Sequence, residues 1–334
     1  MNNTFITPKK CDSFISLRGS DLQDLLLEME KYLLEYRNTL NLPNNLTFGV
    51  ELEYEGFNRM HSSKFIKKNL EGWVSKSDGS LFTGGEITSP IMIDDKKYWE
   101  ELKKICDFLT KKKADTLHNA GGHIHIGVNI LDTDVIAWRN FLKLYIAYEN
   151  VIFRFVYGDK LNARENLFRY ATPRAESLIK GLNIFNQINT FEDIFEVIYK
   201  STFERYAAVN FNNINFNNLN SRSHKNTIEF RSPNATTSEV VWQNNINTFA
   251  KMLISSKEKV MDEDFLDYKL KHEFIPYYKN EYMYNNVNLK NALEFVDLIF
   301  DNNLDKVYFL KQYLKNYQEN YGLKETIKAR KFTK

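Results

Sequence analysis

Polar and apolar residues alternate along several short stretches in the middle of the chain. Alternation with a period of two is typical of a β-strand that buries one face, because successive side chains point to opposite sides. The pattern predicts a strand entering a loop over residues 209–220, where the excess of asparagine is typical of compositional bias. It predicts four further strands, at residues 46–55, 85–89, 123–129 and 227–231.

Longer stretches between these strands have apolar residues three and four positions apart, which is the spacing of an amphipathic helix. Pro173 suits the first turn of another helix, and we expect the chain beyond residue 256 to be helical with aromatic loops. Strands in the middle with helices around them predict an α+β fold whose mostly antiparallel sheet has helices on its outer face. The expected helices lie at residues 21–38, 63–70, 98–113, 134–157 and 238–256.

Three pairs of polar residues lie in the predicted strands, and the members of each pair are two positions apart. Both members of a pair therefore point to the same face, while the apolar residues between and beside them point to the other. Such a sheet has one apolar face and one face of carboxylates, imidazoles and a guanidinium, which suits a hard cation and a phosphorylated substrate. The pairs are Glu51 and Glu53, His123 and His125, and Glu229 and Arg231.

Gathering these acids with Glu86 on adjacent strands creates an electrostatic problem. Two bare carboxylates ~4 Å apart repel each other by roughly 4 kcal/mol at an effective dielectric constant of about 20. Bound cations or strongly raised pKa values are needed to keep four of them on one face. Oxygen-rich sets with an occasional imidazole favour Mg²⁺ or Mn²⁺ over Zn²⁺, and two such ions would cancel the four acidic charges. A nucleotide triphosphate would then need further positive charge, which Arg231 can supply.

Each motif by itself also fits a purely structural role. A Glu-x-Glu pair on a strand is usually a solvated face, and Glu229 with Arg231 is typical of a cross-strand ion pair. Glu86 could cap a turn. Their conjunction favours a site, because a fold rarely places four such segments in one sheet for solubility.

The overall charge gives no reason to expect broad electrostatic binding. The formal net charge is +2 and 26% of the residues are charged, so we expect neither nucleic acid nor membrane partners. The basic C-terminal residues 324–334 are interpreted as a solvated helix, because almost no aromatic residues interleave with the charges. Cys11 and Cys106 form no disulfide or metal-binding pattern, and the first 17 residues lack the apolar stretch of a signal peptide. These features predict a cytoplasmic protein with reduced thiols.

Five segments, in order along the chain, resemble the amidoligase family of carboxylate–amine ligases, which share the glutamine synthetase and glutamate–cysteine ligase fold. The resemblance spans residues 46–255 and implies a sheet of the half-barrel type found in the glutamine synthetase catalytic domain. Residues 1–45 are then an N-terminal helical extension, and residues 256–334 a C-terminal helical segment packed on the same domain. The segments are Phe48-Gly-Val-Glu-Leu-Glu53, Trp73 with Asp78-Gly-Ser80, Gly85-Glu-Ile-Thr-Ser-Pro90, Gly121-Gly-His-Ile-His-Ile-Gly127 and Thr227-Ile-Glu-Phe-Arg231.

The resemblance implies two metal ions and an ATP. Glu53 and Glu86 would hold one ion, and the other ion would lie closer to the γ-phosphate. The remaining implied roles are as follows: Glu51, His123 and Glu229 hold the second ion, His125 contacts nucleotide phosphate or substrate, Arg231 clamps the transferring phosphoryl group, and Asp78 orients the incoming amine.

The chain departs from the glutamine synthetase pattern at one position. Glutamine synthetases have an arginine two residues before the last glutamate of the site, whereas this chain has Thr227. Lys225, Arg222 and Arg205 are the candidates to replace the missing phosphate contact. Glu55 shares the face of Glu51 but is not required by the motif, so we interpret it as a bystander.

The implied reaction forms an amide or isopeptide bond through an acyl phosphate, between a carboxylate and an amine of small molecules or peptides. The residues leave two alternatives open, namely a metal-dependent hydrolase or phosphoesterase that uses the same acids, and a non-catalytic binding protein on a ligase fold. The identities of the acid and the amine stay open, and so does the oligomeric state. The helical segments outside residues 46–255 are candidates for shaping substrate choice or for a contact between copies of the chain.

Overall fold

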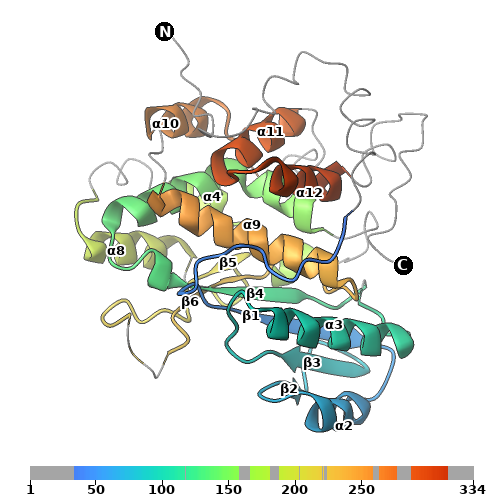
Figure 1. The fold of residues 1–334 in the computed structure, drawn as a ribbon. Coiled ribbons are helices and arrows are strands. Elements are labelled where there is room, and N and C mark those ends of the chain that lie inside the picture. The colour runs from blue at the N-terminus through green and yellow to red at the C-terminus, as the bar shows by residue number, and fades with distance from the viewer. Residues whose placement is uncertain are drawn as a thin grey trace.

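A six-stranded sheet forms the middle of the molecule, and each strand is antiparallel to its neighbours (Figure 1). The computed structural model describes residues 34–116, 118–157, 166–180, 188–202, 204–219, 221, 224–258, 263–276 and 287–314. Across the sheet the strand order is β2–β3–β1–β4–β6–β5. The strands are β1 Phe48–Glu55, β2 Val74–Lys76, β3 Gly84–Thr88, β4 Gly122–Gly127, β5 Val209–Asn210 and β6 Thr227–Phe230.

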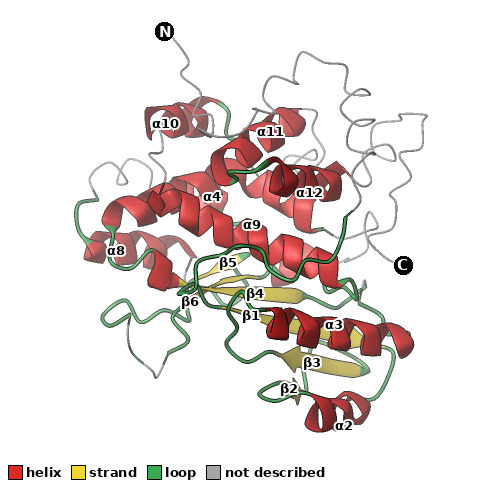
Figure 2. Cartoon of the chain, viewed as in Figure 1, coloured by secondary structure: helices red, strands yellow, loops and turns green. Residues whose placement is uncertain are grey.

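Helices gather on one side of this sheet, as Figure 2 shows in red. Two long helices, α4 and α9, pack against each other above the sheet. Helices α10, α11 and α12 contact α4, and α11 and α12 also contact α9. The longer helices are α2 Arg59–Asn69, α3 Lys96–Lys111, α4 Val135–Val156, α8 Phe191–Thr202, α9 Glu239–Glu258, α10 Glu263–His272, α11 Val287–Ile299 and α12 Asn303–Leu314. Short helices lie at α5 Leu167–Tyr170, α6 Ala175–Ile179 and the 3₁₀ turn η2 Val128–Ile130.

The period-two pattern of the strands produces the contact between these layers. Leu52, Ile124 and Phe230 are fully buried on the face that meets the helices. The Phe230 ring stacks on Phe249 of α9, with the ring centroids 3.9 Å apart. Close packing also requires a glycine at position 122, because a Cβ atom there would lie 2.6 Å from the Asn234 carbonyl oxygen. The helical layer therefore fixes the central strands from their apolar side.

The α+β class, the antiparallel sheet and the helical cover on one face are confirmed. Strands were expected at 46–55, 85–89, 123–129 and 227–231, and β1, β3, β4 and β6 lie there. The half-barrel form of the sheet and the division at residues 45 and 255 stay predictions. Among the described residues, no helix combines the length and apolar character that crossing a membrane requires.

The predicted helix over residues 21–38 is wrong in its described part. Residues 34–38 form no helix, and residues 21–33 lie outside the described residues. The Gln243 side chain of α9 forms hydrogen bonds with both backbone groups of Arg37. It accepts from the Arg37 N–H at 3.0 Å and donates to the Arg37 carbonyl at 2.6 Å. These tertiary hydrogen bonds replace the intrahelical bonds that the local spacing predicted.

Other departures are smaller. Helix α8 was not predicted, α6 begins two residues after Pro173, and the strand expected over residues 209–220 ends at Asn210. Cys106 is buried in the core, whereas Cys11 and the basic residues 324–334 lie outside the described residues.

Candidate functional site

The register of four strands brings the predicted acids and imidazoles together on the face away from the helices. Glu53 of β1 lies opposite Glu86 of β3, and Glu51 lies opposite His123 of β4. On the other side of β4, His125 lies opposite Glu229 of β6. Because these residues share one face of a continuous antiparallel sheet, side chains from distant parts of the sequence become neighbours.

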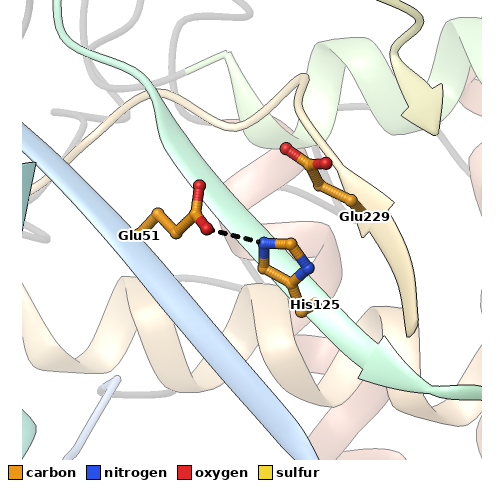
Figure 3. A group of neighbouring side chains, drawn as sticks. All are labelled: Glu51, His125 and Glu229. Carbon is orange, nitrogen blue, oxygen red and sulfur yellow. Dashed lines mark ion pairs between the residues drawn. The ribbon is translucent and has the colours of Figure 1, made fainter. Parts of the chain in front are cut away.

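Glu51 lies at the centre of this cluster. Its carboxylate oxygens are 3.4 Å from His123 Nδ1 and 3.1 Å from His125 Nε2, and Lys225 Nζ donates to it at 3.0 Å. Burial alone would raise the pKa of Glu51, but the hydrogen bonds and charge of the two imidazoles hold this pKa well below its usual range. Glu51 is therefore a carboxylate at neutral pH. Figure 3 shows its ion pair with His125, with Glu229 on the next strand.

Glu229 is held from both sides. Arg231 Nη1 donates to Glu229 Oε1 at 2.5 Å, and the amide nitrogens of Asn210 and Asn213 donate to Oε2 at 3.2 and 3.1 Å. Burial would raise the pKa of Glu229, but the positive charges of the two imidazoles and of Arg231 keep it below its usual value. This second carboxylate is also ionised, with each oxygen in a defined position.

Glu53 and Glu86 are two further acids beside Glu51. The Glu53 carboxylate accepts from the Gly121 N–H at 2.5 Å, and Glu86 accepts from the Thr88 hydroxyl at 3.0 Å. Burial and the nearby charge of Glu51 raise the pKa of Glu86. Such a rise is expected where carboxylates crowd together without a cation.

The donor atoms fall into two sets that fit divalent cations. One ligand atom each from Glu51, His125 and Glu229 lie within 4.8 Å of one another. The same is true of Glu53, Asp78 and Glu86. Oxygen-rich sets of this kind suit Mg²⁺ or Mn²⁺.

His123 lies between these two sets. Its Nδ1 is 3.4 Å from Glu51 and 3.7 Å from Glu229, and its Nε2 is 3.7 Å from Glu53. Among the described residues, the buried Nε2 atom has no hydrogen-bond partner. A buried polar atom without a partner is costly, so a ligand at this nitrogen would remove a penalty. The sequence assigned His123 to the ion at Glu51 and Glu229, whereas the set of donor atoms found within 4.8 Å of one another contains His125.

A cavity of about 420 Å³ opens next to the acids. Its lining includes Asp78, whose carboxylate accepts from the backbone N–H and hydroxyl of Ser80. The lining also contains basic and aromatic residues. These are Tyr170, Arg205, Tyr206 and Arg231, and the guanidinium carbons of Arg205 and Arg231 lie 5.6 and 6.0 Å from the centroid of the Tyr206 ring.

The candidates to replace the missing phosphate contact lie in different places. Arg205 lines the cavity, and Lys225 is bound to Glu51. Thr227 itself binds the Nδ1 atom of His125 through its hydroxyl, at 3.0 Å. Arg222 lies outside the described residues.

Glu55 has a structural role that the motif did not indicate. Its carboxylate accepts from the Phe82 N–H at 2.6 Å and from the Asn119 side-chain amide at 3.0 Å. Phe82 and Asn119 belong to two different loops, and residues of both loops line the cavity. Glu55 therefore holds these two loops beside the cavity.

Sequence reasoning missed the residues that surround Glu229 and Arg231. Tyr170, Tyr206, Asn210 and Asn213 have no motif of their own, and the asparagines lie in a stretch interpreted as compositional bias. The alternation of residues 209–211 was the available signal, because it places Asn210 on the polar face of β5.

A family model described as "Putative amidoligase enzyme" matches residues 74–253, more than half of the 334 residues. The chain belongs to the amidoligase family. The matched span of this amidoligase includes β3, β4 and β6 with their site residues, whereas Glu51 and Glu53 on β1 precede it. The acid cluster of the structure therefore includes one strand, β1, that lies outside the matched span.

The other comparisons give less. No curated protein matches the amidoligase chain. Among solved structures, it is similar to a bifunctional glutathione synthetase from Pasteurella multocida, with 11% sequence identity and a TM-score of 0.43. The similarity covers 88% of this chain and 48% of that protein, so the chain spans about half the length of that protein.

Proposed function

We propose that this amidoligase joins a carboxylate to an amine in an ATP-dependent reaction. The observation that supports this proposal best is the meeting of two acid sets and two histidines beside a cavity that Arg205 and Arg231 also line. Phosphoryl transfer needs charge neutralisation and positioning more than a protein nucleophile, and this arrangement offers both.

The residues of the site would have the following roles. Glu51, His125 and Glu229 would hold one divalent cation, Glu53, Asp78 and Glu86 a second, and His123 would serve as a ligand between them. Cations bound there would offset the negative charge of the nucleotide phosphates. A metal ligand must be deprotonated, and the carboxyl groups of Glu51 and Glu229 are ionised at neutral pH.

The reaction would run in two steps. First, a carboxylate oxygen of the substrate attacks the γ-phosphorus of ATP, the bond to the β-phosphate oxygen breaks, and an acyl phosphate and ADP form. The amine then attacks the acyl carbon, the carbon–oxygen bond to phosphate breaks, and an amide, phosphate and a proton are released. Holding the reactants in line accounts for most of the acceleration.

Two residues of the cavity would act on the reacting groups. Arg231 would donate hydrogen bonds to the phosphoryl oxygens during transfer, since its guanidinium is already oriented by Glu229 and by the Tyr170 carbonyl at 3.3 Å. Asp78, which also lines the cavity, would accept a hydrogen bond from the incoming amine. Arg205 would bind a phosphate or the substrate carboxylate.

The size of the cavity suits a small molecule or part of a peptide. Its volume of about 420 Å³ lies in the usual range for small-molecule sites. A lining with both acidic and guanidinium groups suits a substrate that carries both an amine and an acid, or two substrates of opposite charge.

Adduct screening tests the proposal. The protein is incubated with ATP, Mg²⁺ and a pooled library of acids and amines, and the products are read by mass. We expect ADP release only with an acceptor acid, together with an adduct lighter by one water than its two components. The Glu229→Gln variant is the matched control and should form no adduct. Cleavage of substrates without nucleotide would indicate a hydrolase instead, and failure to bind ATP with Mg²⁺ would indicate a binding protein.

A further inference from the structure

Two asparagine side chains lie next to Glu229 and donate hydrogen bonds to the same one of its two carboxylate oxygens. Asn210 is 4% exposed, at the end of β5, and it is paired with Glu229 in the register of the sheet. Asn213 is half-buried in the following loop. Both donate through Nδ2 to Glu229 Oε2, at 3.2 and 3.1 Å.

The orientation of the Asn210 amide follows from its other contacts. Its Oδ1 accepts from the Asn212 backbone N–H at 2.9 Å. Its Nδ2 also donates to the Arg205 carbonyl at 3.3 Å. A flipped amide would place its oxygen against the Glu229 carboxylate and the Arg205 carbonyl, where it would meet only acceptors. The donor must therefore point to Glu229.

These two donors determine which oxygen of Glu229 faces the acid cluster. With Oε2 bound by both amides, Oε1 points to Arg231, at 2.5 Å, and to His123, at 3.7 Å. A carboxylate that is free to rotate would lose side-chain entropy on binding a cation, and these contacts remove part of that cost in advance. Partners behind a metal ligand typically orient it and raise affinity.

We propose that Asn210 and Asn213 are positioning residues that set Glu229 Oε1 toward a divalent cation. The inference rests on the proposed cation site. It assigns a function to an asparagine-rich segment whose composition alone indicated none. Because Asn210 also binds the Arg205 carbonyl, the same side chain connects the proposed metal ligand Glu229 to a residue that lines the cavity.

Direct titration with Mn²⁺ tests the proposal, using the full chain without nucleotide. Asn210→Ala and Asn213→Ala should each weaken Mn²⁺ binding, by about 10-fold for the more buried Asn210. The exposed Asn212→Ala removes the same side chain between them, keeps its backbone N–H and should bind Mn²⁺ as the wild type does. Thermal unfolding without metal is recorded for every variant, and Asn213→Ala provides the answer if Asn210→Ala does not fold.

A double-mutant cycle separates positioning from general damage. In a Glu229→Gln background, Asn210→Ala should cause no further loss of Mn²⁺ affinity, because its effect passes through the carboxylate. An equal loss in both backgrounds would overturn the proposal, as would unchanged binding by both asparagine variants. Absence of Mn²⁺ binding by the wild type would overturn the proposed cation site itself, which is a different result.

Discussion

Glu51 and Glu86 are neighbouring carboxylates whose pKa values shift in opposite directions. Burial raises the pKa of each. For Glu51 the imidazoles of His123 and His125 more than offset this effect. For Glu86 the charge of Glu51 adds to it, and its pKa remains raised. The cluster therefore contains one acid whose ionised form the fold stabilises and one whose ionised form the fold disfavours.

These opposite shifts predict that replacing each glutamate with glutamine changes the stability of the protein in opposite directions. With EDTA at neutral pH, Glu86→Gln should raise the free energy of unfolding and Glu51→Gln should lower it. A folded-state pKa that is raised lowers stability at pH values above the unfolded-state pKa. The stability gain of Glu86→Gln should therefore vanish below that unfolded-state value of about 4.3. The contribution of Glu51 is present above that value and is lost only as the pH falls through its depressed folded pKa. Denaturant titrations from pH 3 to pH 8 measure both, and equal shifts of the same sign would contradict this account.

Arg231 makes contacts that a lysine cannot reproduce. Its Nη1 donates to Glu229 and its Nε to the Tyr170 carbonyl, so one planar group meets two acceptors in fixed directions. Arg231→Lys should therefore lower kcat of the amidoligase reaction by about tenfold or more, although the charge is kept. Steady-state kinetics with ATP measures this effect. Full activity of the variant would mean that Arg231 forms only a structural ion pair.

At the scale of elements, strand β6 connects the core to the site. Phe230 is fully buried and stacks on α9, while its neighbours Glu229 and Arg231 point to the cluster on the other face. Phe230→Ala should lower the free energy of unfolding by about 3–5 kcal/mol, because it leaves a cavity in the core. Phe82→Ala is the matched control, since Phe82 is 91% exposed, and it should change stability by less than about 0.5 kcal/mol. Similar losses in the two variants would show that the packing of β6 is not decisive.

The strands and the predicted residues on them could be derived from the sequence because alternation reports directly which face a side chain occupies. That reasoning located Glu51, Glu86 and His123 on one face before any register was known. It failed where the partner is distant in sequence. Residues 34–38 form no helix, and Arg37 binds Gln243 of α9 instead. The role of Asn210 depends on its contact with Glu229 across the sheet.

At the scale of the whole molecule, the sheet separates two regions with different chemistry. On one face acids lie beside a polar cavity, while the helical layer on the other face contains buried ion pairs. Lys306 of α12 and Asp297 of α11 are fully buried, with Nζ and a carboxylate oxygen 2.8 Å apart. Lys269 and Glu294 form a second buried pair at 2.6 Å.

Breaking one of these pairs should affect stability without changing the site. Lys306→Met leaves Asp297 as a buried charge and should lower the free energy of unfolding by about 3–5 kcal/mol. Replacing both residues with apolar ones, as Lys306→Met with Asp297→Leu, should recover much of that loss. Denaturant unfolding gives the stability, and Mn²⁺ affinity of the folded variants should match the wild type. A matching drop in Mn²⁺ affinity would show that the two layers are coupled.

The central claim is that one sheet face of this amidoligase binds divalent cations beside a nucleotide. A crystal structure with Mn²⁺ and a non-hydrolysable ATP analogue, recorded with anomalous scattering, tests it most directly. We predict one anomalous peak at Glu51, His125 and Glu229, another at Glu53, Asp78 and Glu86, and nucleotide phosphates between these peaks and Arg231. Nucleotide bound elsewhere, or a face without manganese at saturating concentration, would contradict the account.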